Sequence, residues 1–276
     1  MSDSHVSALS AGRPHSGSST NPIAIFVATR WELQAVRRAL ATDRVATIDG
    51  VRCHIGQRGG VVYWLVQTGV GPLAAGRVAR KVLAAQPMSL LISTGFICAL
   101  EPAQVGDLIV GTEVSSIGFE GVVTGTGVGL LCDDAVRAGC YTVAKNRGMA
   151  WLSGPVISVS TVVWQAEEKR RLRDRTQAIG LDMESGALAT VAYERTVPMV
   201  IVRTVSDLAE EDLPLDFNLF LRPTGWMLGI WALVRHPSSF AGLSRLGRQS
   251  RMAADRLTEW FRYYADSDIG LGRRIG

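Results

Sequence analysis

The chain has 276 residues, of which 47% are hydrophobic and 20% charged, so it can bury the core of one large domain. Its four cysteines include no C-x-x-C pair, which indicates a reducing, cytoplasmic setting. Two of its four histidines lie in the first 20 residues, so few histidines remain in the body to form a zinc site or a serine–histidine triad. The net charge of +4 comes from residues 221–276, which contain nine arginines and four acids. The rest of the chain has 20 basic and 21 acidic residues and is nearly neutral, which argues against a general nucleic-acid groove in the body.

Residues 1–20 are rich in serine and glycine, contain no apolar run long enough for a signal peptide, and predict a disordered leader. Beyond them, short apolar runs alternate with helical patterns. The runs that predict strands are residues 23–28, 61–68, 89–94 (ending at Gly95), 107–111, 155–163 and 197–205, and residues 118–129 resemble a hairpin. Helices are expected after residue 28, over 72–87 and 164–174, and from about 184. The strands are apolar throughout, as in a largely parallel sheet covered on both faces.

The expected fold is therefore α/β, a three-layer α/β/α sandwich with a central mixed, mostly parallel sheet, formed by a body of residues 21–220. Residues 221–276 form a basic tail. In this tail, serines 238 and 239 predict a helix start, after which aromatic and aliphatic residues repeat at helical spacing and arginines fill the intervals. No apolar run reaches the roughly 18 residues that a membrane span needs.

Three carboxylates are predicted at one edge of the sheet, where open α/β sheets bind ligands beyond the carboxyl ends of their strands. Glu32 and Glu184 each begin an apolar helix stripe, and Asp207 directly follows a buried strand. The helix dipole favours an acid in a first turn but does not explain its inward face. Each acid alone has an ordinary alternative: Glu32 as a solvated first-turn acid, Glu184 as an acid satisfied by a neighbouring backbone group or arginine, and Asp207 as a helix cap after Ser206. Together they predict a site.

Several motifs carry a resemblance to a known family. G-L-D-M-E-S-G-A-L-A at 180–189 resembles the D-M-E-[GS]-A-A segment of the purine nucleoside phosphorylase and methylthioadenosine/S-adenosylhomocysteine nucleosidase superfamily. R-T-V-S-D at 203–207, T-G-V-G-P at 68–72 and V-G-D-L-I-V at 105–110 are similar to further motifs of that family, and Glu32 falls where its nucleosidases carry an acid. The resemblance covers residues 22–215 and implies a nucleoside phosphorylase-like fold.

The resemblance implies cleavage of an N-glycosidic bond through a cationic ribosyl transition state. Asp207, oriented by Ser206, would protonate the departing purine, and burial would help it to keep its proton. Glu184 would accept hydrogen bonds from ribose hydroxyls and stabilise the cation, and Met183 would pack on the sugar. Glu32 would orient or deprotonate the attacking water. No cofactor or metal is implied, apart from inorganic phosphate as an alternative co-substrate.

Two departures from the family pattern bear on the substrate. Ser93 stands where related phosphorylases carry an arginine, and Arg30 is the one cation in the loop after the first strand, which favours water over phosphate as the nucleophile. Gly95 is followed by Phe96 and Ile97 where the family has small residues, which predicts a more apolar wall. Trp164 is expected either to stack on the base or to pack at a helix start.

The tail resembles that of one branch, the hopanoid-associated phosphorylases, which are implicated in removing adenine from adenosylhopane. Such an adenosyl-lipid substrate would suit an apolar cavity mouth and a peripheral contact with the inner membrane face through the arginine-rich tail; alternatively, the apolar stripe of the tail packs on the body or across a dimer. The other hypotheses are a soluble methylthioadenosine/S-adenosylhomocysteine nucleosidase, another purine nucleoside phosphorylase, and a non-catalytic nucleoside-binding protein. The family suggests a homodimer or higher homo-oligomer.

Overall fold

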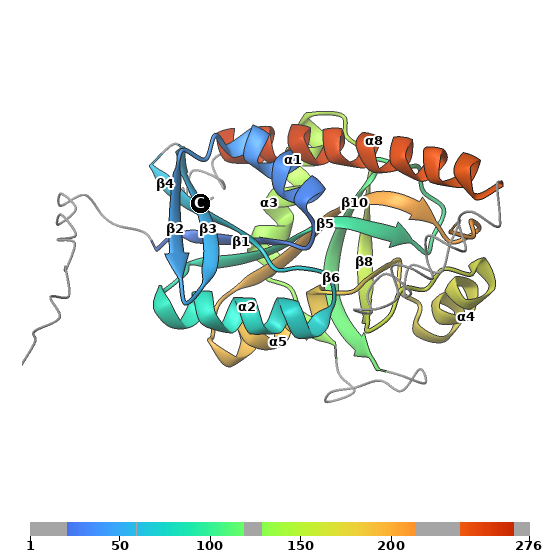
Figure 1. Ribbon diagram of the computed structural model, residues 1–276, viewed down its shortest axis with the longest axis horizontal. Coiled ribbons are helices and arrows are strands. Elements are labelled where there is room, and N and C mark those ends of the chain that lie inside the picture. Colours follow the sequence, from blue (N-terminus) through green and yellow to red (C-terminus); the bar gives the residue numbers. More distant parts are fainter. Residues whose placement is uncertain (1–20, 59, 119–128, 214–237, 268–276) are drawn as a thin grey trace, which may run out of the picture.

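The computed structural model describes residues 21–58, 60–118, 129–213 and 238–267. Within these residues one ten-stranded sheet lies between two layers of helices (Figure 1). Its strands are β1 (Ile23–Val27), β2 (Arg44–Ile48), β3 (Val51–Arg58), β4 (Val61–Gln67), β5 (Leu90–Ala99), β6 (Leu108–Ile117), β7 (Leu130–Leu131), β8 (Trp151–Val159), β9 (Gly180–Asp182) and β10 (Met199–Leu208). The helices are α1 (Arg30–Leu40), α2 (Pro72–Ala85), α3 (Asp134–Asn146), α4 (Ala166–Thr176), α5 (Ser185–Glu194) and α8 (Ser238–Asp266).

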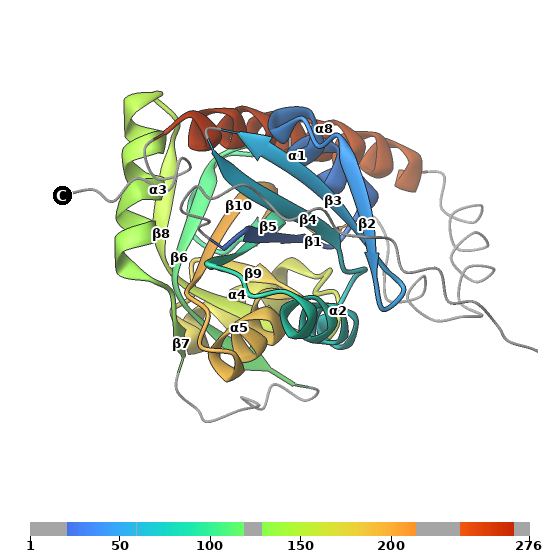
Figure 2. The same cartoon turned by 90° about the vertical axis from the view of Figure 1, so that its left-hand side faces the viewer.

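The sheet is mixed, as predicted, and it curls back on itself. Its main path runs β10-β6-β8-β9-β5-β1-β4-β3-β2, with β7 beside β6. Because β10 also pairs with β5, the strands β5, β10, β6, β8 and β9 form a closed ring, from which β1, β4, β3 and β2 extend as an open sheet (Figure 2). The pairings of β1 with β4 and β5, and of β5 with β10, are parallel, so these strands end at a common edge.

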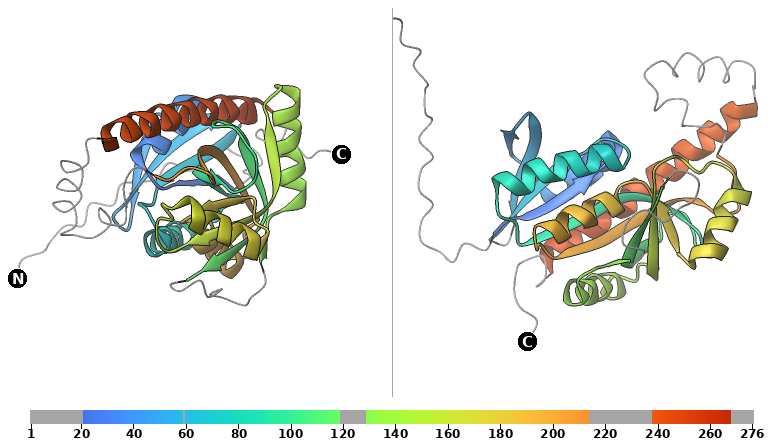
Figure 3. Two further views of the ribbon diagram at one scale, coloured as in Figure 1. Left: turned by 90° about the vertical axis from the view of Figure 1, so that its right-hand side faces the viewer. Right: turned by 90° about the horizontal axis from the view of Figure 1, so that it is seen from below.

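Both faces of the sheet are buried, which explains why its strands are apolar throughout. In β1, Ile23, Ile25 and Val27 contribute to one core cluster, and Ala24 and Phe26 contribute to another. Helices α1, α3 and α8 cover the first face, and α2 and α5 lie side by side on the second (Figures 1 and 3). The expected three-layer α/β/α sandwich is confirmed.

The tail helix α8 belongs to this sandwich. It begins at Ser238, as the serine caps predict, and its aromatic stripe is buried against α1 and α3. Trp260, Phe261 and Tyr264 are all fully buried. The sequence left open whether the apolar stripe faces a membrane or packs on the body. In the structure, the stripe from Trp260 to Tyr264 packs on the body. None of the helices among the described residues is both long and apolar enough to cross a bilayer.

Some predicted elements differ in extent. Strand β5 does not end at Gly95 but continues to Ala99, and β6, whose start was expected within residues 107–111, continues to Ile117. The β2–β3 hairpin and helix α3 were not predicted. The expected leader, most of the expected hairpin over 118–129 and the first part of the tail, residues 221–237, lie outside the described residues.

Candidate functional site

A cavity of about 200 Å³ lies at the common edge where β1, β5 and β10 end. The three carboxylates expected from the sequence, Glu32, Glu184 and Asp207, all line it. They come from three distant segments: the first turn of α1, the residue that precedes α5, and the end of β10. The fold therefore brings the three acids together around one hollow of roughly the size of a sugar.

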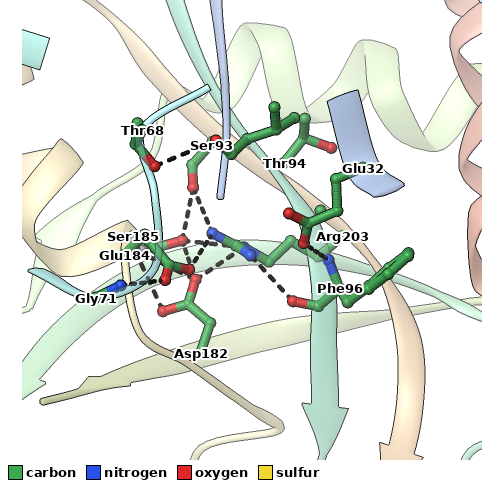
Figure 4. Close-up of polar contacts among 12 residues, drawn as sticks. Glu32, Thr68, Gly71, Ser93, Thr94, Phe96, Asp182, Glu184, Ser185 and Arg203 are labelled. Carbon is green, nitrogen blue, oxygen red and sulfur yellow. Dashed lines mark hydrogen bonds and ion pairs between the residues drawn. The ribbon is translucent and has the colours of Figure 1, made fainter. Parts of the chain in front are cut away.

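Glu32 is held from two sides. Thr29 caps α1 in a capping box, so the Glu32 Oε2 atom accepts hydrogen bonds from the Thr29 backbone N–H at 2.6 Å and from its hydroxyl at 2.9 Å. The other oxygen, Oε1, accepts a hydrogen bond from the Phe96 backbone N–H at 2.7 Å (Figure 4). These three donors fix the carboxylate, which is only 2% exposed, and leave it with unused acceptor capacity.

Gly95 allows this contact between α1 and β5. Its φ of 137° is unfavourable for other residues, and a Cβ atom on Gly95 would overlap the Glu32 carboxylate. Gly95 is not among the residues that line the cavity; its absent side chain makes room for Glu32. The same glycine lets β5 pass beneath the site without interruption, which is why the expected strand break does not occur.

A buried guanidinium lies beneath the site, behind the residues that line it. Arg203, 1% exposed, places its Nε atom 2.8 Å from Asp182 Oδ2 and its Nη2 atom 3.6 Å from Glu184 Oε2. Its Nη1 atom donates to the Phe96 carbonyl at 3.0 Å, and Nη2 also donates to Ser93 Oγ at 3.1 Å (Figure 4). Every nitrogen of Arg203 is thus engaged within the protein.

Ser93, the position where the resemblance led us to look for a phosphate-binding arginine, has a structural role. Ser93 Oγ lies 2.8 Å from Ser185 Oγ, and the Ser185 hydroxyl in turn donates to Asp182. Ser93 and Ser185 thereby link the buried Arg203 to the start of α5. Neither Asp182 nor Arg203 was predicted as a site residue from the sequence, although both lie within the family motifs at 180–189 and 203–207.

Glu184 is buried and shares its cation with a second acid. Its Oε1 atom accepts a hydrogen bond from the Gly71 backbone N–H at 2.8 Å, in the T-G-V-G turn. Burial raises the pKa of Glu184 to about 7; Arg203 and the Gly71 N–H oppose this rise, while Asp182 adds to it. The sequence predicted that Glu184 begins the apolar stripe of the helix. In the structure it is instead the N-cap residue of α5, with φ −123° and ψ −33°.

Asp207 is paired with a lysine that the sequence pattern did not single out. Lys169, on α4, has no exposed side-chain surface, and its Nζ atom donates to Asp207 Oδ2 at 2.9 Å and to the carbonyls of Leu208 and Glu211 at 3.1 and 3.0 Å. Ser206 Oγ donates to Asp207 Oδ1 at 2.9 Å, as expected. Burial alone would lower the pKa of Lys169, but the Asp207 carboxylate raises it above its usual value. The expected role of Asp207 as the proton donor stays a prediction, and the structure adds a buried lysine at hydrogen-bond distance from its carboxylate.

The remaining expected residues divide into two groups. Met183, Phe96 and Ser206 line the cavity, but Trp164 does not. Val162 and Val163 occupy the wall instead, and the half-buried Trp164 receives a hydrogen bond at its carbonyl from the Leu213 N–H. Trp164 thus lies two residues before α4, where the helix-start alternative put it, and outside the cavity lining.

Cys98 also lines the cavity but is poorly suited to act as a nucleophile. Burial raises the pKa of its thiol well above the usual value, and the neighbouring Asp207 carboxylate raises it further. The apolar part of the wall is substantial. Its members are Val70, Phe96, Ile97, Val162, Val163, Leu181, Met183 and Leu213.

The charge of the lining is negative. Glu32, Asp182, Glu184 and Asp207 line the cavity, and no arginine or lysine does so among the residues that the structure describes. The two cations beneath it, Arg203 and Lys169, are both buried and both paired with acids of the site. Such a lining stabilises positive charge that develops within the cavity and disfavours an anion there.

Comparison with known proteins places this arrangement in a family. The family model described as the phosphorylase superfamily matches residues 22–222. Among solved structures, futalosine hydrolase of Helicobacter pylori matches with a TM-score of 0.72 and 16% identity over 90% of this chain and 98% of that one. Two 5'-methylthioadenosine/S-adenosylhomocysteine nucleosidases also match.

The first nucleosidase, a Helicobacter pylori mutant with 5'-methylthioadenosine in the active site, gives a TM-score of 0.68 and 16% identity over 88% of this chain and 98% of that one. The second, from Neisseria meningitidis in complex with methylthio-immucillin-A, gives 0.68 and 18% over 88% and 99%. These likenesses establish the shared fold, and the family model matches most of the chain. The chain therefore belongs to the phosphorylase superfamily.

Proposed function

We propose that this protein is a nucleosidase that cleaves the N-glycosidic bond of an adenosyl nucleoside with water and releases adenine. The observation that carries the proposal is the convergence of Glu32, Glu184 and Asp207 on one cavity, each fixed by its own hydrogen-bond donors. The relatives named above support this reaction class, since their descriptions include nucleosidases and a hydrolase.

Glu184 and the other acids of the lining favour bond breaking. As the bond between C1′ and the purine N9 lengthens, its electron pair leaves with the base and positive charge develops on the ribose. An ionised Glu184 accepts hydrogen bonds from the ribose hydroxyls and interacts more strongly with this cation than with the neutral substrate, which lowers the barrier. Met183, next to Glu184 in the wall, packs against the sugar.

Asp207 and Lys169 supply a proton to the leaving purine. The base departs with an extra electron pair and must gain a proton, for which N7 is the accessible acceptor. Asp207 faces the cavity with one oxygen bonded to Lys169 and the other to Ser206. We assign the proton to Lys169 in the resting enzyme: Asp207 passes it to N7 as negative charge grows on the base, and the Lys169–Asp207 pair is then reprotonated from solvent.

Glu32 orients the nucleophile. Its carboxylate accepts three hydrogen bonds from the protein, and its remaining acceptor capacity can hold one water against the ribosyl cation. The water oxygen forms the new bond to C1′, its proton passes to Glu32, and Glu32 then releases this proton to solvent. The balance is one water consumed, with free adenine and a ribose bearing a C1′ hydroxyl as products.

Hydrolysis is favoured over phosphorolysis by the electrostatics of the lining. A phosphate would enter a cavity that has four carboxylates and, among the described residues, no available arginine or lysine. Ser93 is bonded to Arg203 and Ser185 rather than facing the cavity as an anion donor. Phosphorolysis is the alternative that an assay must address.

For the substrate, we propose adenosylhopane or a related adenosyl-lipid, with a soluble methylthioadenosine/S-adenosylhomocysteine substrate as the alternative. The support is the apolar wall, in which Phe96 and Ile97 stand where small residues are usual in the family. The tail no longer supports a membrane contact through its aromatic stripe, because Trp260, Phe261 and Tyr264 are buried in the core.

The test is adenine release by the purified full-length protein. Substrates are adenosylhopane in phosphatidylcholine vesicles, 5′-methylthioadenosine and S-adenosylhomocysteine, each with and without inorganic phosphate. We expect release without phosphate, a free ribosyl product, and a loss of about 100- to 1,000-fold in Glu184→Gln. Release that requires phosphate and yields a sugar 1-phosphate would contradict hydrolysis. Binding of a nucleoside with no release by the wild type would instead support the non-catalytic alternative.

A further inference from the structure

A second, larger cavity lies on the other side of the T-G-V-G turn. It has a volume of about 570 Å³ and lies between the outer stripe of α1, the β2–β3 hairpin, the end of β4 and α2. It shares no lining residue with the acidic cavity, although Arg30 and Gly69 of this lining are next in sequence to Thr29 and Val70 of the other. The proposed function makes no use of it.

The charge of this second cavity is positive. Arg30, Arg37 and Arg52 line it, and no aspartate or glutamate does so among the described residues. None of the three arginines forms an ion pair with a carboxylate in the described part of the chain; Arg37 makes one hydrogen bond, to Thr42 Oγ1 at 3.3 Å. The acid next to the lining, Asp49, is already paired with Lys81 at 3.0 Å. The cationic charge is therefore uncompensated.

His54 provides an independent sign of a missing ligand. It lines the same cavity, is 8% exposed, and its Nδ1 atom is buried without a hydrogen-bond partner among the described residues. An unsatisfied buried polar atom destabilises the fold unless a bound molecule satisfies it. Burial lowers the pKa of His54, and the nearby Arg37 and Arg52 guanidiniums lower it further, so these three side chains are close enough to interact. A neutral imidazole can still donate one N–H to an anion.

We propose that this cavity binds a phosphate-bearing small molecule, with its phosphate group between Arg37, Arg52 and His54. Guanidinium groups bind phosphate in a bidentate manner, and two of them match a dianion better than a carboxylate. Arg30 lies seven residues before Arg37 on α1, about 10 Å along the helix, so the site can also hold a second anionic or polar group. Leu33, Val51 and Val78 give the cavity an apolar side against which the body of the molecule packs.

The experiment measures binding of inorganic pyrophosphate, with inorganic phosphate and succinate as comparison probes. The chain has only four histidines, so the ring signals of ¹³C-labelled histidine are few, and His54→Gln identifies the His54 signal. We expect pyrophosphate to shift the His54 signal, and Arg52→Gln, an exposed position, to weaken binding by about tenfold or more.

Matched controls separate binding in this cavity from nonspecific attraction of anions to a basic surface. Arg44→Gln removes the same charge from an exposed position on the neighbouring strand β2, outside the lining, and should change the affinity by less than about twofold. Glu184→Gln should leave pyrophosphate binding intact, which distinguishes this site from the acidic cavity. The proposal is overturned if the His54 signal does not respond to millimolar pyrophosphate, if Arg44→Gln weakens binding as much as Arg52→Gln, or if succinate binds as tightly as pyrophosphate.

Discussion

The two buried cations beneath the acidic cavity differ in how many acids they serve. Arg203 lies between two carboxylates, at 2.8 Å from Asp182 and 3.6 Å from Glu184. Lys169 serves one carboxylate, Asp207, at 2.9 Å, and its other two hydrogen bonds go to backbone carbonyls. Arg203 carries one positive charge for two carboxylates, so the negative charge of Asp182 and Glu184 is only partly compensated. Lys169 carries one positive charge for one carboxylate, so the charge of Asp207 is balanced.

The pKa values of Glu184 and Lys169 reflect this difference. Burial with incomplete compensation raises the pKa of Glu184 to about 7, so near neutrality this carboxyl group can gain or lose a proton. At the other pair, the carboxylate raises the pKa of Lys169, which keeps its proton. In the proposed mechanism, these two acid–cation pairs supply one acid that titrates near neutrality and one lysine that holds the proton for the leaving base.

The largest expected effect is on Asp207. We expect Asp207→Asn to lower kcat/KM for adenine release by about 100- to 10,000-fold, because the amide cannot relay a proton to the purine. Ser206→Ala, which removes only an orienting hydrogen bond to the same carboxylate, should cost much less. Steady-state kinetics on both variants provide the measurement; equal losses would mean that proton transfer is not the role of Asp207.

Lys169→Met tests the balanced pair. The methionine leaves the Asp207 carboxylate without its cation, and we expect the free energy of unfolding to fall by about 3 kcal/mol in urea denaturation. The double variant Lys169→Met/Asp207→Asn removes both charges and should recover part of this loss. No recovery in the double variant would show that the lysine stabilises the fold through its two carbonyl contacts alone.

The undercompensated pair predicts a pH dependence. The proposed mechanism requires an ionised Glu184, so kcat/KM should rise with pH through an apparent pKa near 7. Asp182 contributes to the raised pKa of Glu184, so Asp182→Asn should move this limb of the profile to lower pH by about one unit. Asp174→Asn, an exposed acid on α4, is the control that should leave the profile in place.

The smallest effect concerns stability. The folded-state pKa of Glu184 lies above its ordinary value of 4.5, so the folded protein binds this proton more tightly than the unfolded chain does. Its contribution therefore becomes less favourable as pH rises from about 4.5 to about 7 and stays constant above that. Glu184→Gln should reduce this pH-dependent loss by about 1–3 kcal/mol, measured as Tm or urea stability between pH 5 and 8. An unchanged slope would mean that Glu184 is ionised throughout.

The three carboxylates could be predicted because strand ends are a feature of the sequence pattern. Glu32 and Asp207 follow apolar runs, and parallel strands end at one edge, so their convergence needs no knowledge of side-chain contacts. The cations beneath them could not be found in this way. Lys169 lies in a helix with the sequence A-E-E-K-R-R-L-R-D-R-T, whose other charged residues are not buried, and nothing in that pattern distinguishes one inward-facing lysine.

Other differences have local physical causes. The β2–β3 hairpin was missed because β2 has no buried residue, although Asp49 and Gly50, both with positive φ, form the D-G pair typical of a tight hairpin turn. The expected break at Gly95 was wrong, since the glycine there serves the close approach of Glu32 rather than a turn. The close approach of Glu32 to Gly95 joins two segments that are distant in the sequence, so it can be recognised only in the folded structure.

The packing of α8 on α1 links the last described helix of the chain to its first. Thr258 donates a hydrogen bond to the Ala35 carbonyl at 2.9 Å, and α1 also carries Glu32 in its first turn. During synthesis, α1 leaves the ribosome more than 200 residues before its partner helix does. The apolar side of α1 is therefore left uncovered until α8 has been synthesised, and Glu32, in the first turn of α1, can take its final position only after that packing forms.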